Sequence, residues 1–136
     1  MIEKFQEVQV LDNFYQTSSF YPMPTVMVTT VSDSGLTNVG AYSLCFPFGI
    51  AEEHYMMLIS RADSNTSLNL QKNKYCALNF IPYNKKFLKN TVLLGYPGET
   101  TEAKLQDCNY TLKKTLRTNQ DNKVIYPDVI EESVQI

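Results

Sequence analysis

Residues 25–46 have the sequence TVMVTTVSDSGLTNVGAYSLCF, which predicts a pair of strands. The first part, residues 25–31, is dominated by β-branched side chains, and these favour a strand. The prolines just before it favour an extended approach and cannot lie inside a helix. Gly35 can adopt the left-handed conformation that closes a tight turn. A second strand over residues 36–46 then completes an antiparallel hairpin.

Four further elements follow this hairpin along the chain. Residues 54–60 are mostly apolar on both faces, which predicts a central strand covered on both sides. Residues 63–73 begin with good N-cap residues and predict a short helix. Residues 75–81 form the next strand, which Pro82 ends. In residues 84–94 the apolar side chains recur at helical spacing and predict an amphipathic helix. These apolar side chains are Phe87, Leu88, Val92 and Leu93.

The two ends of the chain complete the pattern. Residues 1–20 have helical spacing and predict a short helix, residues 117–123 predict an exposed loop, and a strand begins at residues 133–136. A chain of 136 residues is long enough for one core but marginal for two. We therefore expect a single domain over residues 1–136 that is mainly β, with antiparallel strands and short helices.

Charge and composition exclude several classes of function. Hydrophobic residues make up 43% of the chain and charged residues 19%, as is typical of a globular domain. The 12 basic and 14 acidic residues are spread along the chain, so no basic field for nucleic acid arises. The sequence has neither an apolar run long enough to span a membrane nor a pattern for export. We expect a cytoplasmic protein that binds neither nucleic acid nor membranes.

Cysteine and histidine are too few and too scattered to predict a metal site. The cysteines Cys45, Cys76 and Cys108 have no CxxC spacing, and His54 is the only histidine. Cys45 and Cys76 lie in apolar runs, where a free thiol usually acts as a small buried hydrophobe. His54 has no serine or cysteine partner for nucleophilic catalysis, so we expect it on the surface.

The segment Ser60–Thr66 joins a predicted strand to a predicted helix and has the composition of an anion site. The first turn of a helix leaves backbone N–H groups unpaired and carries a positive dipole end, and both favour a phosphate. Arg61 adds a permanent forked charge, while Ser64 and Thr66 add hydroxyl donors. The alternative is that a hydroxyl only caps the helix while Arg61 pairs with a surface carboxylate.

The segment Asn38–Ser43 places small residues in the middle of a predicted strand. Glycine weakens a strand interior unless something must approach its backbone closely. A flat ring laid against the strand at Gly40 would explain the choice, with Ser43 near the polar edge of the ring. A bulge or a bend at a barrel corner would explain it equally well.

Glycine-rich phosphate loops are absent from the sequence. It contains no GxGxxG, no Walker-type loop and no paired-carboxylate spacing, which argues against Rossmann and P-loop enzymes. If the chain catalyses a reaction, a bound cofactor carries the chemistry.

Taken in order, several of these segments resemble the flavin-reductase-like, FMN-binding split-barrel family. The likeness covers about residues 22–82, and its specificity comes from the order and spacing of short motifs. A weaker similarity to the family lies at Lys104-Leu105 and at residues 127–132. The segments that carry the resemblance are Pro24-Thr25-Val26, Thr29-Thr30, Asp33-Ser34-Gly35, Thr37-Asn38-Val39, Tyr42-Ser43, Ser60-Arg61, Asn65-Thr66, Asn69-Leu70 and Tyr75-Cys76-Ala77-Leu78-Asn79.

The resemblance implies an antiparallel split β-barrel that works as a homodimer, with one FMN per subunit near the interface. It implies a phosphate site at Arg61, Ser64, Asn65 and Thr66. It also implies that the ring and ribityl chain lie against Gly40, Ala41, Tyr42, Ser43 and Ser60, with Pro24 and Thr25 approaching from the first strand.

Two functions follow from the resemblance. The first is an FMN-dependent oxidoreductase in which NADH or NADPH reduces the flavin, and the flavin then passes electrons to an acceptor. The second is a non-catalytic split-barrel module that binds FMN or another ligand. Members of the family usually continue beyond the position of Ile136 with further strands, and the lack of these strands here favours the module.

Overall fold

The computed structural model describes residues 24–50, 52–117 and 124–136. The predicted helix in residues 1–20 and most of the predicted loop at 117–123 lie outside them. The described part is mainly β with short helices, as expected, and all of its paired strands are antiparallel. The strands are β1 Val26–Val31, β2 Thr37–Tyr42, β3 Cys45–Ile50, β4 Glu53–Leu58, β5 Cys76–Phe80, β6 Leu112–Lys113 and β7 Val129–Ile130. The helices are α2 Asn65–Asn73, α3 Lys85–Gly95 and α4 Thr101–Gln106.

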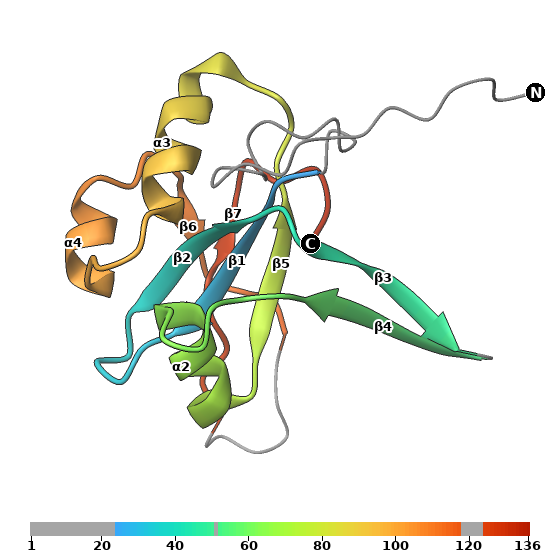
Figure 1. The fold of residues 1–136 in the computed structure, drawn as a ribbon. Coiled ribbons are helices and arrows are strands. Elements are labelled where there is room, and N and C mark those ends of the chain that lie inside the picture. The colour runs from blue at the N-terminus through green and yellow to red at the C-terminus, as the bar shows by residue number, and fades with distance from the viewer. Residues whose placement is uncertain (1–23, 51, 118–123) are drawn as a thin grey trace, which may run out of the picture.

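A three-stranded sheet in the order β2-β1-β5 forms the centre of the fold (Figure 1). The predicted hairpin is confirmed, because β1 and β2 pair without interruption and Gly35 has a φ of 77° in the connecting turn. Every residue of β1 is buried. On one face Met27 and Val39 pack with Phe87 and Leu94 of α3, and on the other Val26 and Val28 pack beside the beginning of β3.

The predicted second strand is shorter than expected and is divided in two. β2 ends at Tyr42, the chain bends at Ser43 and Leu44, and β3 leaves the central sheet to pair with β4. Pro47 in β3 has no N–H to donate to a second neighbour, so it suits a strand that is paired on one side only. The prediction of a single strand over residues 36–46 was therefore wrong.

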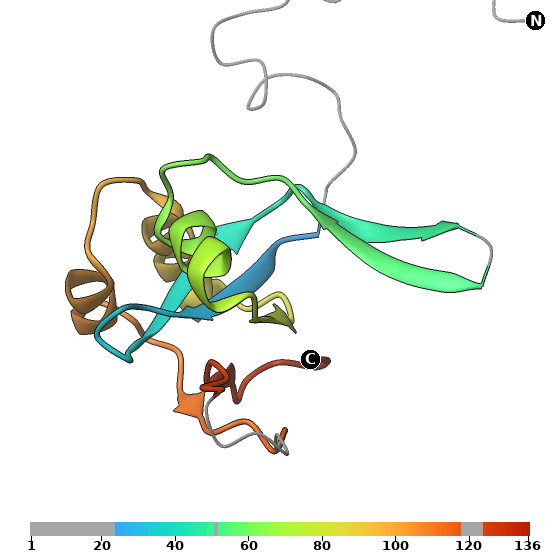
Figure 2. The same cartoon turned by 90° about the horizontal axis from the view of Figure 1, so that it is seen from below.

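The prediction of a central, covered strand at residues 54–60 was also wrong. β4 pairs only with β3 among the described residues, and the β3–β4 hairpin extends away from the sheet (Figures 1 and 2). Tyr55, Met56 and Met57 are exposed on it, and His54 is exposed as predicted. An apolar pattern on both faces indicates a surface that favours burial, but it does not say whether the same chain covers that surface.

Helix α3 begins close to the predicted residue, with Asn84 as its N-cap, but most of the side chains that face the core are not the predicted ones. Its buried side chains are Phe87, Asn90 and Leu94, whereas Leu88, Val92 and Leu93 are about half exposed. The polar Asn90 faces inward because its amide binds the backbone of residues 107–109: Nδ2 donates to the Asp107 oxygen, and Oδ1 accepts from the Asn109 N–H. This hydrogen bonding outweighs the apolar spacing seen in the sequence.

The C-terminal segment docks on the central sheet through the fully buried Asn79 of β5. Its Nδ2 donates to the Met27 oxygen at 3.0 Å, and its Oδ1 accepts from the Ile130 N–H of β7 at 2.9 Å. At residues 133–136, where a strand was expected to begin, a single bridge joins Gln135 to Phe80. None of the described helices is long and apolar enough to cross a membrane.

Candidate functional site

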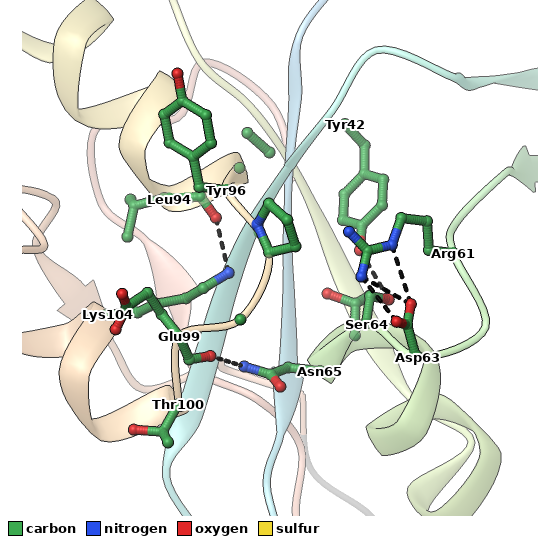
Figure 3. Close-up of a pocket in the computed structure, with 16 residues that line it drawn as sticks. Tyr42, Arg61, Asp63, Ser64, Asn65, Leu94, Tyr96, Glu99, Thr100 and Lys104 are labelled. Carbon is green, nitrogen blue, oxygen red and sulfur yellow. Dashed lines mark hydrogen bonds and ion pairs between the residues drawn. The ribbon is translucent and has the colours of Figure 1, made fainter.

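A cavity of about 370 Å³ lies along the edge of β2 that faces away from β1 (Figure 3). One wall comes from β2 and the beginning of α2, and the other comes from the end of α3, the following loop and α4. Backbone groups of an edge strand that point away from the neighbouring strand have no ladder partner. The lining residues are Gly40, Ala41, Tyr42, Arg61, Asp63, Ser64, Asn65, Thr66, Leu94, Gly95, Tyr96, Pro97, Gly98, Glu99, Thr100 and Lys104.

A cluster of hydroxyl groups stands at the N-terminus of α2. Ser64 is the N-cap, with an extended backbone, and its Oγ accepts from the Ser67 N–H at 3.1 Å. Its Oγ also lies 2.8 Å from Ser60 Oγ, which lies 3.0 Å from the Tyr42 hydroxyl. Ser64 therefore caps the helix, and the same cap places three hydroxyls beside the cavity.

Arg61 already has a carboxylate partner in this structure. Its Nε and Nη2 donate to Asp63 Oδ1 at 3.0 and 2.9 Å, and Nη2 also donates to Asp63 Oδ2 at 2.9 Å. Both side chains are more than half exposed, so the pair contributes little to stability. Its importance is electrostatic, because the Asp63 charge offsets the Arg61 charge at the rim of the cavity.

A buried amide fixes the first turn of α2 against the sheet. Asn38 on β2 is almost completely buried, and its Nδ2 donates to Thr66 Oγ1 at 3.4 Å. Its Oδ1 accepts from Asn65 Nδ2 and from Thr101 Oγ1, both at 3.4 Å. These contacts are long, but together they join β2, α2 and α4 behind the cavity.

Gly40 allows the close approach of two cavity residues. A Cβ atom at this position would lie 3.0 Å from Thr66 Oγ1 and 3.0 Å from Cε2 of the Tyr42 ring. The β1–β2 register continues unbroken through Gly40, so the bulge alternative is excluded. The glycine leaves room for α2 and for the Tyr42 ring, which the sequence did not indicate.

The second wall of the cavity, Leu94–Thr100 with Lys104, was not predicted. Lys104 Nζ donates to the Leu94 oxygen at 3.0 Å, and Asn65 Nδ2 donates to the Glu99 oxygen at 2.8 Å. Burial lowers the pKa of Lys104, and the Glu99 charge raises it in part. The available signals were Thr100, which caps α4, and the helix-forming residues after it.

Most of the predicted site residues come together in this cavity. The residues that line it are Gly40, Ala41, Tyr42, Arg61, Ser64, Asn65 and Thr66. Ser60 is hydrogen-bonded to two of them, Tyr42 and Ser64. The structure does not bring the other three there. Ser43 is exposed at the bend after β2, while Pro24 and Thr25 line a separate cavity beside Phe87 and Tyr110. Pro24 and Thr25 do not reach the cavity because they precede β1, and β2 lies between β1 and the open edge of the sheet.

Among the described residues, no three His, Cys, Asp or Glu side chains gather as they would around an ion.

Comparison with solved structures found proteins of similar fold. No family model matches the chain, and no curated protein matches it. The structure is similar to that of 2-nitrobenzoate 2-nitroreductase from Pseudomonas fluorescens, with a TM-score of 0.66 and 18% identity over 94% of this chain. It is also similar to nitrilotriacetate monooxygenase component B from Bacillus cereus, with a TM-score of 0.67 and 15% identity over 96% of this chain.

This chain therefore has the fold found in a nitroreductase and in a monooxygenase component. It spans 61% of the length of the first protein and 65% of the second.

Proposed function

We propose that this protein is a flavoprotein of the FMN-binding split-barrel type, with FMN bound in the cavity beside β2. One observation carries the proposal: the residues that the sequence marked for a flat ring and those that it marked for a phosphate line the same cavity. They are Gly40, Ala41 and Tyr42 for the ring and Arg61, Ser64, Asn65 and Thr66 for the phosphate. The similarity of the fold to a nitroreductase and a monooxygenase component supports the same class of chemistry.

The residues of the cavity suit this cofactor. Its volume of about 370 Å³ lies within the usual range for small-molecule sites. The open edge of β2 offers backbone donors and acceptors for the polar edge of a ring. The N-terminus of α2, with its hydroxyl cluster, favours a phosphate, because unpaired N–H groups and the helix dipole both attract an anion.

When bound, the flavin supplies hydride acceptance and onward electron transfer. The residues of the chain bind and orient it. The hydroxyls of Tyr42, Ser60 and Ser64 and the charge of Arg61 would hold the polar tail, while β2 and the Leu94–Thr100 wall would exclude water from the sides of the ring. We propose that NADH or NADPH donates the hydride.

Flavin binding and turnover are measured separately. Purified protein is titrated with FMN, and binding is followed by quenching of flavin fluorescence. NADH or NADPH is then added to the complex without oxygen. We expect binding followed by bleaching of the yellow colour. Binding without bleaching would identify the non-catalytic module, and absence of binding would reject the proposed function.

We further propose that the protein is a homodimer joined through the β3–β4 hairpin. In the antiparallel register Phe48 lies opposite Tyr55 and Phe46 lies opposite Met57, so these four side chains share one face of the hairpin. Phe48, Tyr55 and Met57 are 42, 50 and 39% exposed. A two-stranded hairpin is marginally stable in water unless its apolar face packs against something, and aromatic residues and methionine are enriched in protein interfaces.

A further inference from the structure

We infer that Lys104 binds the anionic group of the cavity's ligand, a role that neither the sequence patterns nor the resemblance assigned to it. The inference rests on the proposed function and deepens it, because it concerns the contact with the phosphate of FMN. Three observations carry it: the position of the ammonium group, its missing counter-ion and the paired state of Arg61.

The position of Lys104 is fixed by α4 and by the end of α3. The side chain is half-buried, lines the cavity and donates one hydrogen bond to the Leu94 oxygen. An ammonium group has three donors, so two are left for other partners. Figure 3 shows Lys104 and Arg61 on opposite sides of the cavity.

Lys104 has no carboxylate partner within ion-pair distance in the described part of the chain. The four ion pairs found there involve Arg61, Lys72, Lys113 and Lys114. Glu99 acts on Lys104 only at longer range. A partly buried charge without a counter-ion is unfavourable, and its burial lowers the pKa of Lys104. An anion that enters the cavity would remove this penalty.

Arg61 is the less effective of the two cations. Its guanidinium is bound by both oxygens of Asp63 and is more than half exposed, so water screens it and Asp63 offsets its charge. A phosphate that approaches Arg61 also approaches the Asp63 carboxylate. Lys104 therefore offers the stronger net attraction for a dianion.

The experiment compares FMN with riboflavin, which has the same ring and ribityl chain but no phosphate. Dissociation constants for both are measured on wild-type protein, Lys104→Met, Lys104→Arg and Arg61→Ala. Methionine keeps much of the aliphatic stem and removes the charge. Lys89→Met is the matched control, because Lys89 is exposed on α3 and lines none of the cavities described above.

We expect Lys104→Met to weaken FMN binding by about 10- to 150-fold, the loss typical of a hydrogen bond to a charged group. Riboflavin binding should change much less, which also shows that the cavity remains folded. Lys104→Arg should retain most of the preference for FMN. Arg61→Ala should cause a smaller FMN-specific loss than Lys104→Met, and Lys89→Met should change neither constant.

Other results would overturn the inference. Equal losses for FMN and riboflavin in Lys104→Met would mean that Lys104 acts by capping α3 or by contacting the ring. No loss for either ligand, or a larger FMN-specific loss in Arg61→Ala, would mean that Arg61 and the N-terminus of α2 hold the phosphate without Lys104, while flavin binding itself stands. Wild-type protein that binds neither flavin would reject the proposed function together with this inference.

Discussion

At the scale of single residues, Gly40 shows how one missing side chain shapes the site. Thr66 and the Tyr42 ring occupy the space that a Cβ atom at Gly40 would need, and both line the cavity. Thr66 is buried and hydrogen-bonded to Asn38, so it has little freedom to move away.

Gly40→Ala should therefore lower stability and weaken flavin binding together. Overpacking of a well-packed site typically costs about 1 to 3 kcal/mol, and here it would push the first turn of α2 away from β2. Urea unfolding and flavin titration measure the two effects. The control is Gly49→Ala in β3, where the new Cβ would meet the Glu53 oxygen at an ordinary 3.5 Å. Equal effects of the two substitutions would contradict this account.

The thiols of Cys45 and Cys76 have a different environment in the folded chain from the one they have in the unfolded chain. Cys45 is buried, as predicted, whereas Cys76 is only partly buried. Burial raises the pKa of both thiols. Because the thiolate is the reactive form, a raised pKa means less reactive species at neutral pH.

We expect both cysteines to react slowly with a thiol reagent in the folded protein and quickly in urea. The folded-state rate should rise only at a higher pH than the rate for the unfolded chain, since the raised pKa delays ionisation. Mass spectrometry of the labelled peptides distinguishes the two sites. Fast labelling of both in the folded state at neutral pH would show that burial does not protect them.

At the scale of elements, Asn79 decides how the C-terminal segment packs on the sheet. One amide side chain satisfies a backbone oxygen of β1 and a backbone N–H of β7 inside the core. A polar side chain at such a position is stable only because both ends are paired.

Asn79→Ala should lower the free energy of unfolding by about 1 to 3 kcal/mol, because the buried Ile130 N–H and Met27 oxygen lose their partner. Urea denaturation measures the change. Asn109→Ala is the control, since the Asn109 side chain is exposed and makes none of the hydrogen bonds found among the described residues. A loss as small as that of the control would indicate that water or another group replaces the amide.

At the scale of the whole molecule, the β3–β4 hairpin leaves an apolar face exposed. The proposed homodimer would bury the face formed by Phe46, Phe48, Tyr55 and Met57. It would also explain why Tyr55 and Met57 on this face of β4 are apolar although a single chain leaves them exposed.

Light scattering at micromolar concentration should give twice the chain mass of 15.6 kDa for the wild-type protein. Tyr55→Ser combined with Met57→Lys should give the single-chain mass, because a charge in an apolar interface loses its hydration without gaining a partner. Leu93→Lys, on the exposed side of α3, is the control and should leave the dimer intact. A monomeric wild-type protein, or a dimeric double variant, would reject the proposed interface.

The sequence predicted the elements whose signals are local. The β-branched run of β1, the turn at Gly35, the Ser64 cap of α2 and the strand ended by Pro82 each depend on neighbouring residues, so their patterns identified them. The same local signals marked residues 40–42 and 61–66, and the fold brings both segments to one cavity.

Only the tertiary structure decided which surfaces meet. The bend after Tyr42, the exposure of β4 and the inward position of Asn90 all depend on contacts between segments far apart in the chain. The second wall of the cavity depends on the same kind of contact. The hydrophobic pattern of a sequence indicates how much surface favours burial, whereas packing and hydrogen bonding determine which segment covers that surface. For that reason Lys104, to which the sequence assigned no role, emerges as a candidate ligand only in the folded chain.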